Sequence, residues 1–433
     1  MTRRDVASPA EDDSSESARP LDRRSLLACL ATLSGGCAGT SDTTVTDVPT
    51  RTLARTGTST PTPTTASEGP IVVAGTLPLS GSLSAIGVPL REGLFSWSTY
   101  VNRNGGLRGR TVDLRIEDDR GKPSVAREAY RSFVDGADLL IAPYGSRATK
   151  AIIDVVESAG LPCVAHTAGE RSIWAGGREW TVQLLNPIDT FLHSLLAVVA
   201  RRGAESVALL YRDDSFTPTM MNGAVERARE LGWRITAEVT YTSTDDIVSK
   251  MEAVTDSTPD LLIGGGFQPG AAGGGFLPDA VALSRAYQQA DGSAGLVNWA
   301  IGASFPAFRR RRGAVAGLEA GVTGWKPYVD FPGNAGFIDR YREQVGEPPD
   351  AHAAQGYATG QVLAAAVDRA GSFDPGAVRD ALFALRTATV FGRYRVDERG
   401  LEVGKHNAVV QWQDGDPTVV GPERWREGKL VYS

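Results

Sequence analysis

The chain has 433 residues, of which 42% are hydrophobic and 22% are charged, and its formal net charge is −6. This length exceeds the size at which one hydrophobic core usually keeps growing, so at least two folded units are expected. A mild acidic excess offers no broad basic surface that could release the counterions of a phosphate backbone. The composition therefore argues against nucleic acid as a partner.

An arginine pair precedes a short apolar run near the N-terminus. Arg23 and Arg24 are followed by the run from Leu26 to Leu33, and Cys37 comes after a Ser-Gly-Gly spacer. The run is too short to span a bilayer as a helix. Residues 1–37 resemble a twin-arginine lipoprotein signal, in which Cys37 is the lipid attachment site and anchors the processed chain. An ordinary polar tail is the alternative.

Residues 38–69 are rich in Thr, Ser and Pro and poor in large apolar side chains. Such a segment buries too little surface to offset the entropy cost of ordering the chain, so it is predicted to be a disordered stalk. Besides the anchor, Cys163 would be the one cysteine left after processing. No disulfide within the processed chain is therefore expected.

From residue 71 onward, short apolar runs alternate with segments of helical periodicity. The predicted strands of the first half are 71–75, 111–116, 138–142 and 162–165, and its predicted helices are 89–100, 124–134 and 148–159. Alternation of this kind predicts an α/β unit in which helices flank a parallel sheet.

The same alternation restarts after Pro187. Predicted helices are 189–201, 219–231, 247–254, 278–289, 335–345, 353–370 and 377–385, predicted strands are 206–211, 234–241, 261–265 and 295–300, and short strands follow residue 391. The glycine-rich segment 266–275 is predicted to be a loop. The pattern as a whole predicts two similar α/β halves.

Motifs for catalysis and for metal binding are missing from the sequence. It has no Gly-x-Ser-x-Gly elbow, no two histidines at metal-ligand spacing, and no cysteine pair. Gly264 to Gly266 follow a predicted strand but lack the spacing of a dinucleotide-binding loop. We therefore expect a protein that is not an enzyme and has no cofactor or metal. A hydrolase whose catalytic triad uses His166 or His352 is the alternative.

Three loops that follow predicted strands combine small hydroxyl residues with open backbone amides. They contain Ser80 and Ser82 in the first, Tyr144, Gly145 and Ser146 in the second, and Ala165, His166, Thr167, Ala168 and Gly169 in the third. Such loops gather at the carboxyl edge of a parallel sheet, where α/β proteins bind small ligands. Their N–H groups and hydroxyls suit an anion such as a carboxylate. For each loop alone, a capped helix start is the alternative.

Several segments resemble one family of binding proteins. They are VVAGTLPLSGSLSAIGVPLREGLFSWSTYVNRNGGLRGRTVDLRIEDDRGKPSVA, LLIAPYGSRAT, AGLPCVAHTAGE, VALLYRDDSF and QGYATGQVLAAAVDRAG. Residues 71 to about 400 are similar to the extracellular solute-binding proteins of ABC transporters, of the branched-chain amino-acid (Leu/Ile/Val-binding, receptor-family ligand-binding) type.

This resemblance implies the type I periplasmic-binding-protein fold, in which two Rossmann-like lobes are joined by three crossover strands and close on a ligand. The expected division is 70–187 plus 318–395 for lobe I and 188–317 plus 396–433 for lobe II. Residues 1–37 and 38–69 would precede the lobes as signal and stalk.

The resemblance also implies roles for particular residues. In the family, the second and third loops named above hold the ligand's carboxylate, and Asp214 and Phe216 contribute from lobe II. The acidic residue that holds the ligand's amino group in the family has no counterpart in the matching region 298–302. Phe267 and Gln268 are what the glycine-rich loop offers instead. Candidates for apolar walls are Tyr144, Phe216, Phe267 and Trp299, and for each a place in the core is the alternative.

The implied function is that of a substrate-binding lipoprotein of an ABC importer. It would capture a small solute (an amino acid, an amide or a related carboxylate) between its lobes and deliver it to permease subunits in the membrane. We expect a monomer on the outer face of the cytoplasmic membrane, anchored through Cys37. A ligand sensor of the same fold that signals to a receptor is the alternative, and a surface hydrolase is a less favoured one.

Overall fold

The computed structural model describes residues 69–271, 275–313, 319–327 and 329–432. The predicted signal, Cys37 and all of the predicted stalk except Gly69 lie outside these residues. Within the described ranges, no helix is both long and apolar enough to cross a membrane.

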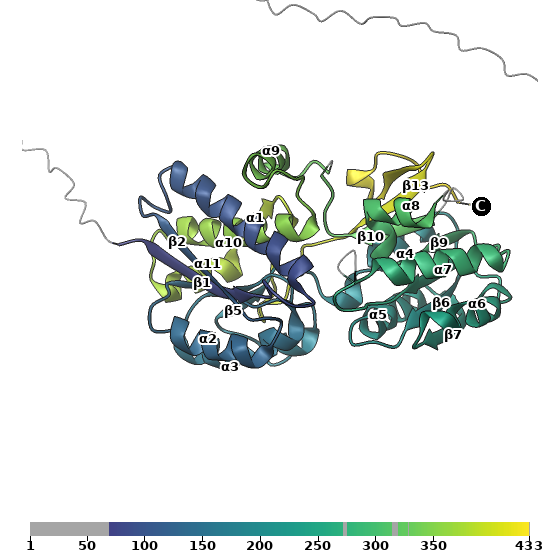
Figure 1. The fold of residues 1–433 in the computed structure, drawn as a ribbon, viewed down its shortest axis with the longest axis horizontal. Helices are drawn as coiled ribbons and strands as arrows, with labels where there is room; N and C mark the ends of the chain where they lie inside the picture. Colours follow the sequence, from purple (N-terminus) through teal and green to yellow (C-terminus); the bar gives the residue numbers. More distant parts are fainter. Residues whose placement is uncertain (1–68, 272–274, 314–318, 328, 433) are drawn as a thin grey trace, which may run out of the picture. The chain divides into compact units, whose positions relative to one another are not determined.

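The first lobe is built on a parallel sheet with the strand order β2-β1-β3-β4-β5 (Figure 1). Its strands are β1 (Ile71–Leu77), β2 (Val112–Asp118), β3 (Leu139–Ile141), β4 (Cys163–Ala165) and β5 (Thr181–Gln183). Its helices are α1 (Ser84–Arg103), α2 (Pro123–Phe133), α3 (Gly145–Ala159), α9 (Asn334–Val345), α10 (Ala351–Ala370) and α11 (Pro375–Ala384), and η1 (Arg171–Trp174) is a short 3₁₀ helix. The late helices α9 to α11 thus return to the lobe in which the chain begins.

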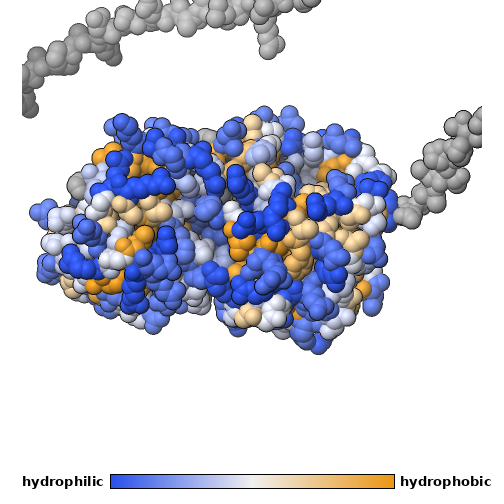
Figure 2. Space-filling model, turned by 180° about the vertical axis from the view of Figure 1, so that it is seen from behind, coloured by the Kyte–Doolittle hydropathy of each residue, from blue (hydrophilic) through white to orange (hydrophobic). Residues whose placement is uncertain are grey.

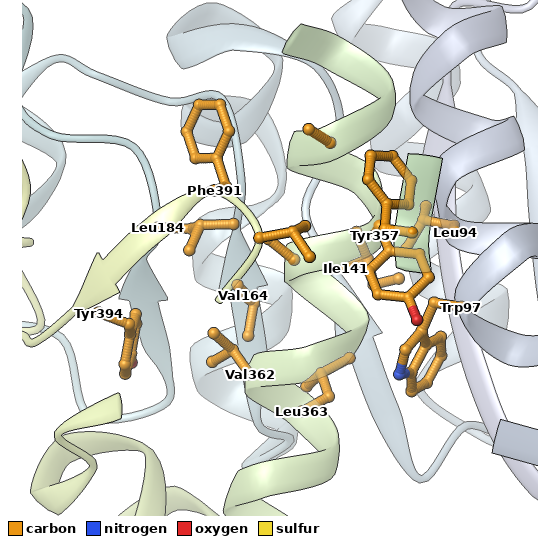
Figure 3. Close-up of a cluster of buried hydrophobic side chains, with 14 of the residues drawn as sticks. Leu94, Trp97, Ile141, Val164, Leu184, Tyr357, Val362, Leu363, Phe391 and Tyr394 are labelled. Carbon is orange, nitrogen blue, oxygen red and sulfur yellow. The ribbon is translucent and has the colours of Figure 1, made fainter. Parts of the chain in front are cut away.

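Two apolar cores cover the two faces of this sheet. On one face, α1 and α10 pack together against the strands, and Figure 3 shows Trp97 of α1 beside Tyr357 of α10, with Ile141 of β3 nearby. On the other face, α2 and α3 bury Tyr130 and Ile152 against the same sheet. A sheet that is covered on both faces explains why β1, β3 and β4 are nearly continuous apolar runs.

The second lobe is built on a mixed sheet with the order β14-β13-β10-β9-β8-β6-β7. Its strands are β6 (Ser206–Arg212), β7 (Arg234–Tyr241), β8 (Leu261–Gly265), β9 (Leu296–Asn298), β10 (Glu319–Thr323), β13 (Ala408–Gln413) and β14 (Asp416–Gly421). Its helices are α4 (His193–Ala200), α5 (Thr217–Glu230), α6 (Ile247–Thr255), α7 (Leu277–Gln289) and α8 (Pro306–Arg312), with the 3₁₀ helices η2 (Ile188–Thr190), η3 (Thr244–Asp246), η4 (Gly302–Ser304) and η5 (Glu423–Trp425). β13 and β14 are antiparallel to their neighbours, whereas the rest of the sheet is parallel.

The chain passes between the two lobes three times. It leaves the first sheet after β5, returns to the first lobe between β10 and α9, and passes back between the two-stranded sheet β11 (Thr387–Thr389) and β12 (Gly392–Tyr394) and strand β13. This confirms the predicted fold class, an α/β protein of type I periplasmic-binding-protein architecture. The expected boundary at residue 318 would assign β10 to lobe I, but β10 pairs with β9 and β13 of the second sheet. The remaining boundaries stay predictions.

The face of the protein shown in Figure 2 is mostly hydrophilic and carries separate apolar patches. Among the large hydrophobic residues that the structure describes, Phe95 and Val248 have the largest exposed fractions, 48% and 50%. Single exposed apolar side chains of this kind are ordinary on a protein surface.

Candidate ligand-binding site

A cavity of about 360 Å³ lies where segments of both lobes come together. Residues of lobe I reach it from the loops after β3 and β4 and from the start of α10. Residues of lobe II reach it from the starts of α5 and α7 and from the region of η4, and the segment that leaves β10 completes the lining. A volume of this size falls in the range of small-molecule sites in proteins.

Aromatic side chains form much of the cavity wall. They are Tyr144, Phe191, Phe216, Phe276, Phe305, Trp325 and Phe391. Phe216 is the centre of a cluster, because its ring lies 6.1 Å from that of Phe191, 5.8 Å from that of Phe267 and 5.3 Å from that of Phe276. Phe267 does not line the cavity itself, but its ring packs against those of Phe216 and Phe276, which do.

The two predicted loops after β3 and β4 are hydrogen-bonded to each other. The backbone N–H of Gly145 donates to Thr167 Oγ1 over 2.8 Å, and the N–H of Gly169 donates to Ser146 Oγ over 3.2 Å. These amides are therefore occupied within the protein. Of the predicted residues in both loops, Tyr144 and Thr167 line the cavity.

Ala165, at the end of β4, and His166 and Ala168 of the following loop are completely buried. Burial lowers the pKa of His166 to about 3, so the imidazole is neutral at ordinary pH. Neither ring nitrogen has a hydrogen-bond partner among the described residues. The backbone oxygen of His166 accepts a hydrogen bond from Gln355, which does line the cavity.

Ser80 and Ser82 belong to the loop after β1 and do not line the cavity. The Ser80 hydroxyl donates to Asp118 Oδ2 over 2.6 Å at the surface. Ser82 lies close to Gly270 in the glycine-rich segment of lobe II, since a Cβ added to Gly270 would stand 2.9 Å from the Cβ of Ser82. This first loop therefore touches the second lobe beside the cavity.

Asp214 caps the start of α5. Its carboxylate accepts hydrogen bonds of 2.7 Å from the backbone N–H groups of Phe216, Thr217 and Phe267 and from the Thr217 hydroxyl. A carboxylate oxygen commonly satisfies these free N–H groups at a helix start. Asp214 therefore fixes the backbone of Phe216 and of Phe267, whose rings belong to the aromatic cluster.

Gln268 and Trp299 do not line the cavity. Gln268 donates its amide hydrogen to the buried carboxylate of Asp279. Trp299 is fully buried, and its ring packs against Tyr287 of α7, with 5.9 Å between the ring centroids.

Lys326 lines the cavity and was missed by the sequence reasoning. It follows β10, and the carbonyl of Lys326 accepts from Asn334 Nδ2, which also donates to the carbonyls of Pro327 and Val329. Lys326 is only 6% exposed, and its ammonium donates to the backbone oxygen of Ser304. Burial lowers its pKa to about 8. The Trp-Lys-Pro sequence after a strand carries no motif that would have indicated a binding residue.

Asp350 also lines the cavity and was missed as well. It caps α10, because Oδ1 accepts from the backbone N–H of Ala353 over 2.9 Å. Its other oxygen lies 3.5 Å from His352 Nδ1. Partial burial acts to raise the pKa of Asp350, but the hydrogen bonds from His352 and Ala353 outweigh it and the pKa is lowered.

No cluster of metal-ligating side chains occurs in the part of the chain that the structure describes. Asn407 adds a polar group to the lining, since its Oδ1 is buried without a partner among the described residues while its Nδ2 donates to the backbone oxygen of Phe191. The cavity is thus mainly apolar, with a few polar groups and one buried cation.

Two α/β lobes, three connecting segments and a ligand-sized cavity between them define a binding protein of the periplasmic type. A sequence model of the periplasmic binding protein family matches residues 70–416, and the chain belongs to that family. Membership implies an extracytoplasmic location.

Curated and solved relatives are similar over most of their length. A Leu/Ile/Val-binding protein homolog 7 of Brucella suis biovar 1 (strain 1330) is 23% identical over 385 residues, which cover 80% of this chain and 90% of the relative. A putative branched-chain amino acid ABC transporter protein from Rhodospirillum rubrum shares the fold with a TM-score of 0.69 and 23% identity, over 81% of this chain and 99% of that one. A solute-binding protein of an ABC transporter from R. palustris, solved with benzoate, has a TM-score of 0.63 and 19% identity, over 82% and 96%. These relatives are binding proteins of transporters rather than enzymes.

Proposed function

We propose that this chain is the lipid-anchored solute-binding component of an ABC importer, and that it captures a small solute in the cavity and delivers it to a membrane permease. The observation that carries this proposal is the cavity itself, which is lined from both lobes by aromatic side chains and a few polar groups. A ligand enclosed by both lobes would stabilise their closed arrangement, which a permease can recognise. The names of the relatives support an amino acid or another small carboxylate as cargo.

Ligand binding is tested by thermal unfolding of the full chain with amino acids, amides and organic acids. A compound that binds only the folded protein, present at 100 times its Kd, stabilises it by about 2.7 kcal/mol. We expect Phe216→Ala to weaken the binding of that compound about tenfold or more, because it removes the centre of the cavity wall.

Phe95→Ala is the matched control, because it makes the same change at an exposed site outside the cavity. It should leave binding unchanged. The proposal fails if no compound shifts the unfolding midpoint, or if both variants bind as the unmodified chain does.

Anchoring is tested by cell fractionation of a Cys37→Ser variant. The unmodified chain should fractionate with membranes, and Cys37→Ser should lose most of this association because a lipid chain can no longer be attached. Cys29→Ser, within the predicted apolar run, is the control and should remain with the membranes. If Cys37→Ser still fractionates as the unmodified chain does, Cys37 is not the anchor.

A further inference from the structure

The charge of Lys326 is not compensated by the residues around it. The side chain is 6% exposed, and its one hydrogen bond among the described residues goes to the backbone oxygen of Ser304. It forms no ion pair with a carboxylate of the described residues, and burial alone accounts for its lowered pKa. An ammonium that is held out of water is costly unless an anion pairs with it. Lys326 is also one of the residues that line the cavity.

The walls near this cation are suited to an apolar body. Leu185, Ile301 and Val322 join the aromatic side chains in the lining, and Pro306 and Pro348 add further apolar surface. A ligand that fits these walls would be aliphatic or aromatic over most of its surface, with one anionic end.

Asp350 is the carboxylate that lines the cavity, and it is already paired. It accepts from the N–H of Ala353 at the start of α10 and lies beside His352. Its side chain is 46% exposed, so water also solvates its charge. The charge of Asp350 is therefore compensated without a ligand ammonium, whereas the charge of Lys326 is not paired with an anion.

We infer that the cavity binds an apolar monocarboxylate without an α-ammonium group, and that Lys326 Nζ pairs with its carboxylate. This inference rests on the proposed function, because it takes the cavity as the ligand site. It narrows the proposed cargo from an amino acid or another small carboxylate to carboxylates that lack an amino group.

The test compares matched compounds on the full chain by calorimetric titration: leucine, 4-methylpentanoate, which is leucine without its amino group, and 4-methylpentanamide, which in addition lacks the charge. The pair phenylalanine and 3-phenylpropanoate repeats the comparison with an aromatic body. We expect the two carboxylates without an amino group to bind at least about tenfold more tightly than the amino acids and the amide.

Lys326→Met should lower the affinity for these carboxylates at least about thirtyfold, because their charge would be buried without a partner. The same variant should unfold at an unchanged or higher temperature without ligand, because it removes an unpaired buried cation. Lys122→Met, at an exposed lysine before α2, is the control and should bind as the unmodified chain does.

Different outcomes of this test bear on the inference and on the proposed function. Tighter binding of leucine or phenylalanine than of their deaminated counterparts overturns the inference while the proposed function stands. Carboxylate binding that survives Lys326→Met overturns the role of Lys326, and if that variant does not fold, the comparison of compounds on the unmodified chain decides. If none of the compounds binds, the inference is overturned, and the proposed function falls with it when the wider set of amino acids, amides and acids also fails to bind.

Discussion

Replacing Asp279 by alanine is expected to destabilise the protein by about 3–5 kcal/mol, as for other buried ion pairs that lose one partner. Asp279 is completely buried in α7, and its two oxygens accept from Arg212 Nε over 2.6 Å and from Arg212 Nη2 over 2.9 Å. The Tyr241 hydroxyl donates to the same carboxylate over 3.0 Å, and Gln268 also donates to it. The alanine variant leaves the guanidinium of Arg212, which is 13% exposed, without its counterion.

Urea denaturation measures the predicted loss of stability of Asp279→Ala as a lower unfolding midpoint. Glu230→Ala is the control, because it removes the surface partner of Arg227, 2.7 Å away, from a pair that is exposed to water. Such pairs contribute about 0–1 kcal/mol, so this variant should unfold almost as the unmodified chain does. The double variant Arg212→Met with Asp279→Leu should recover part of the loss. Equal stability of Asp279→Ala and Glu230→Ala would show the prediction to be wrong.

Gly93→Val is expected to destabilise the first lobe by about 3 kcal/mol or more, because it forces apart two helices that pack with almost no space between them. A Cβ at position 93 of α1 would stand 2.0 Å from the backbone oxygen of Ala353 in α10. On the facing helix, a Cβ at Gly356 would stand 2.2 Å from the backbone oxygen of Leu90. Backbone atoms cannot turn aside as a flexible side chain can, so the helices themselves must move.

This variant should also weaken ligand binding, since the start of α10 carries four residues that line the cavity, Asp350, Ala351, His352 and Gln355. Thermal unfolding and calorimetric titration measure the two effects. Gly136→Val is the matched control, because position 136 has open space around it, and it should change stability by no more than about 0.5 kcal/mol. A Gly93→Val protein as stable as Gly136→Val would contradict the close packing of α1 and α10.

The predicted elements agree with the structure where a local apolar run forms a buried strand. The run at 71–75 falls in β1 and that at 206–211 in β6, because both are buried on two sides of a parallel sheet. The short strand β5 was not predicted. Its three residues include the polar Thr181 and Gln183, which are buried because β5 pairs with β4 at the edge of the sheet. Pairing between distant segments is not visible in local periodicity.

The predicted site was likewise only partly right, because local sequence patterns do not show which way a side chain points in the folded protein. Tyr144, Thr167 and Phe216 line the cavity, because they follow strands or begin helices at the carboxyl edges of their sheets. Trp299 follows β9 as well, yet its ring turns into the core against α7. The direction of a side chain at a strand end depends on the helix packed beside it, which sequence spacing does not specify.

The sequence by itself determined the α/β class and the family, together with two strand-end loops that meet at the cavity. These features depend on local burial patterns and on segments whose residues are adjacent in the chain. Only the tertiary structure decided that Lys326 and Asp350 line the same cavity, since a segment after β10 and the start of α10 come together there through crossings between the lobes. It also decided that Lys326 has no carboxylate partner among the described residues, because burial and charge pairing arise only when distant parts of the chain pack together.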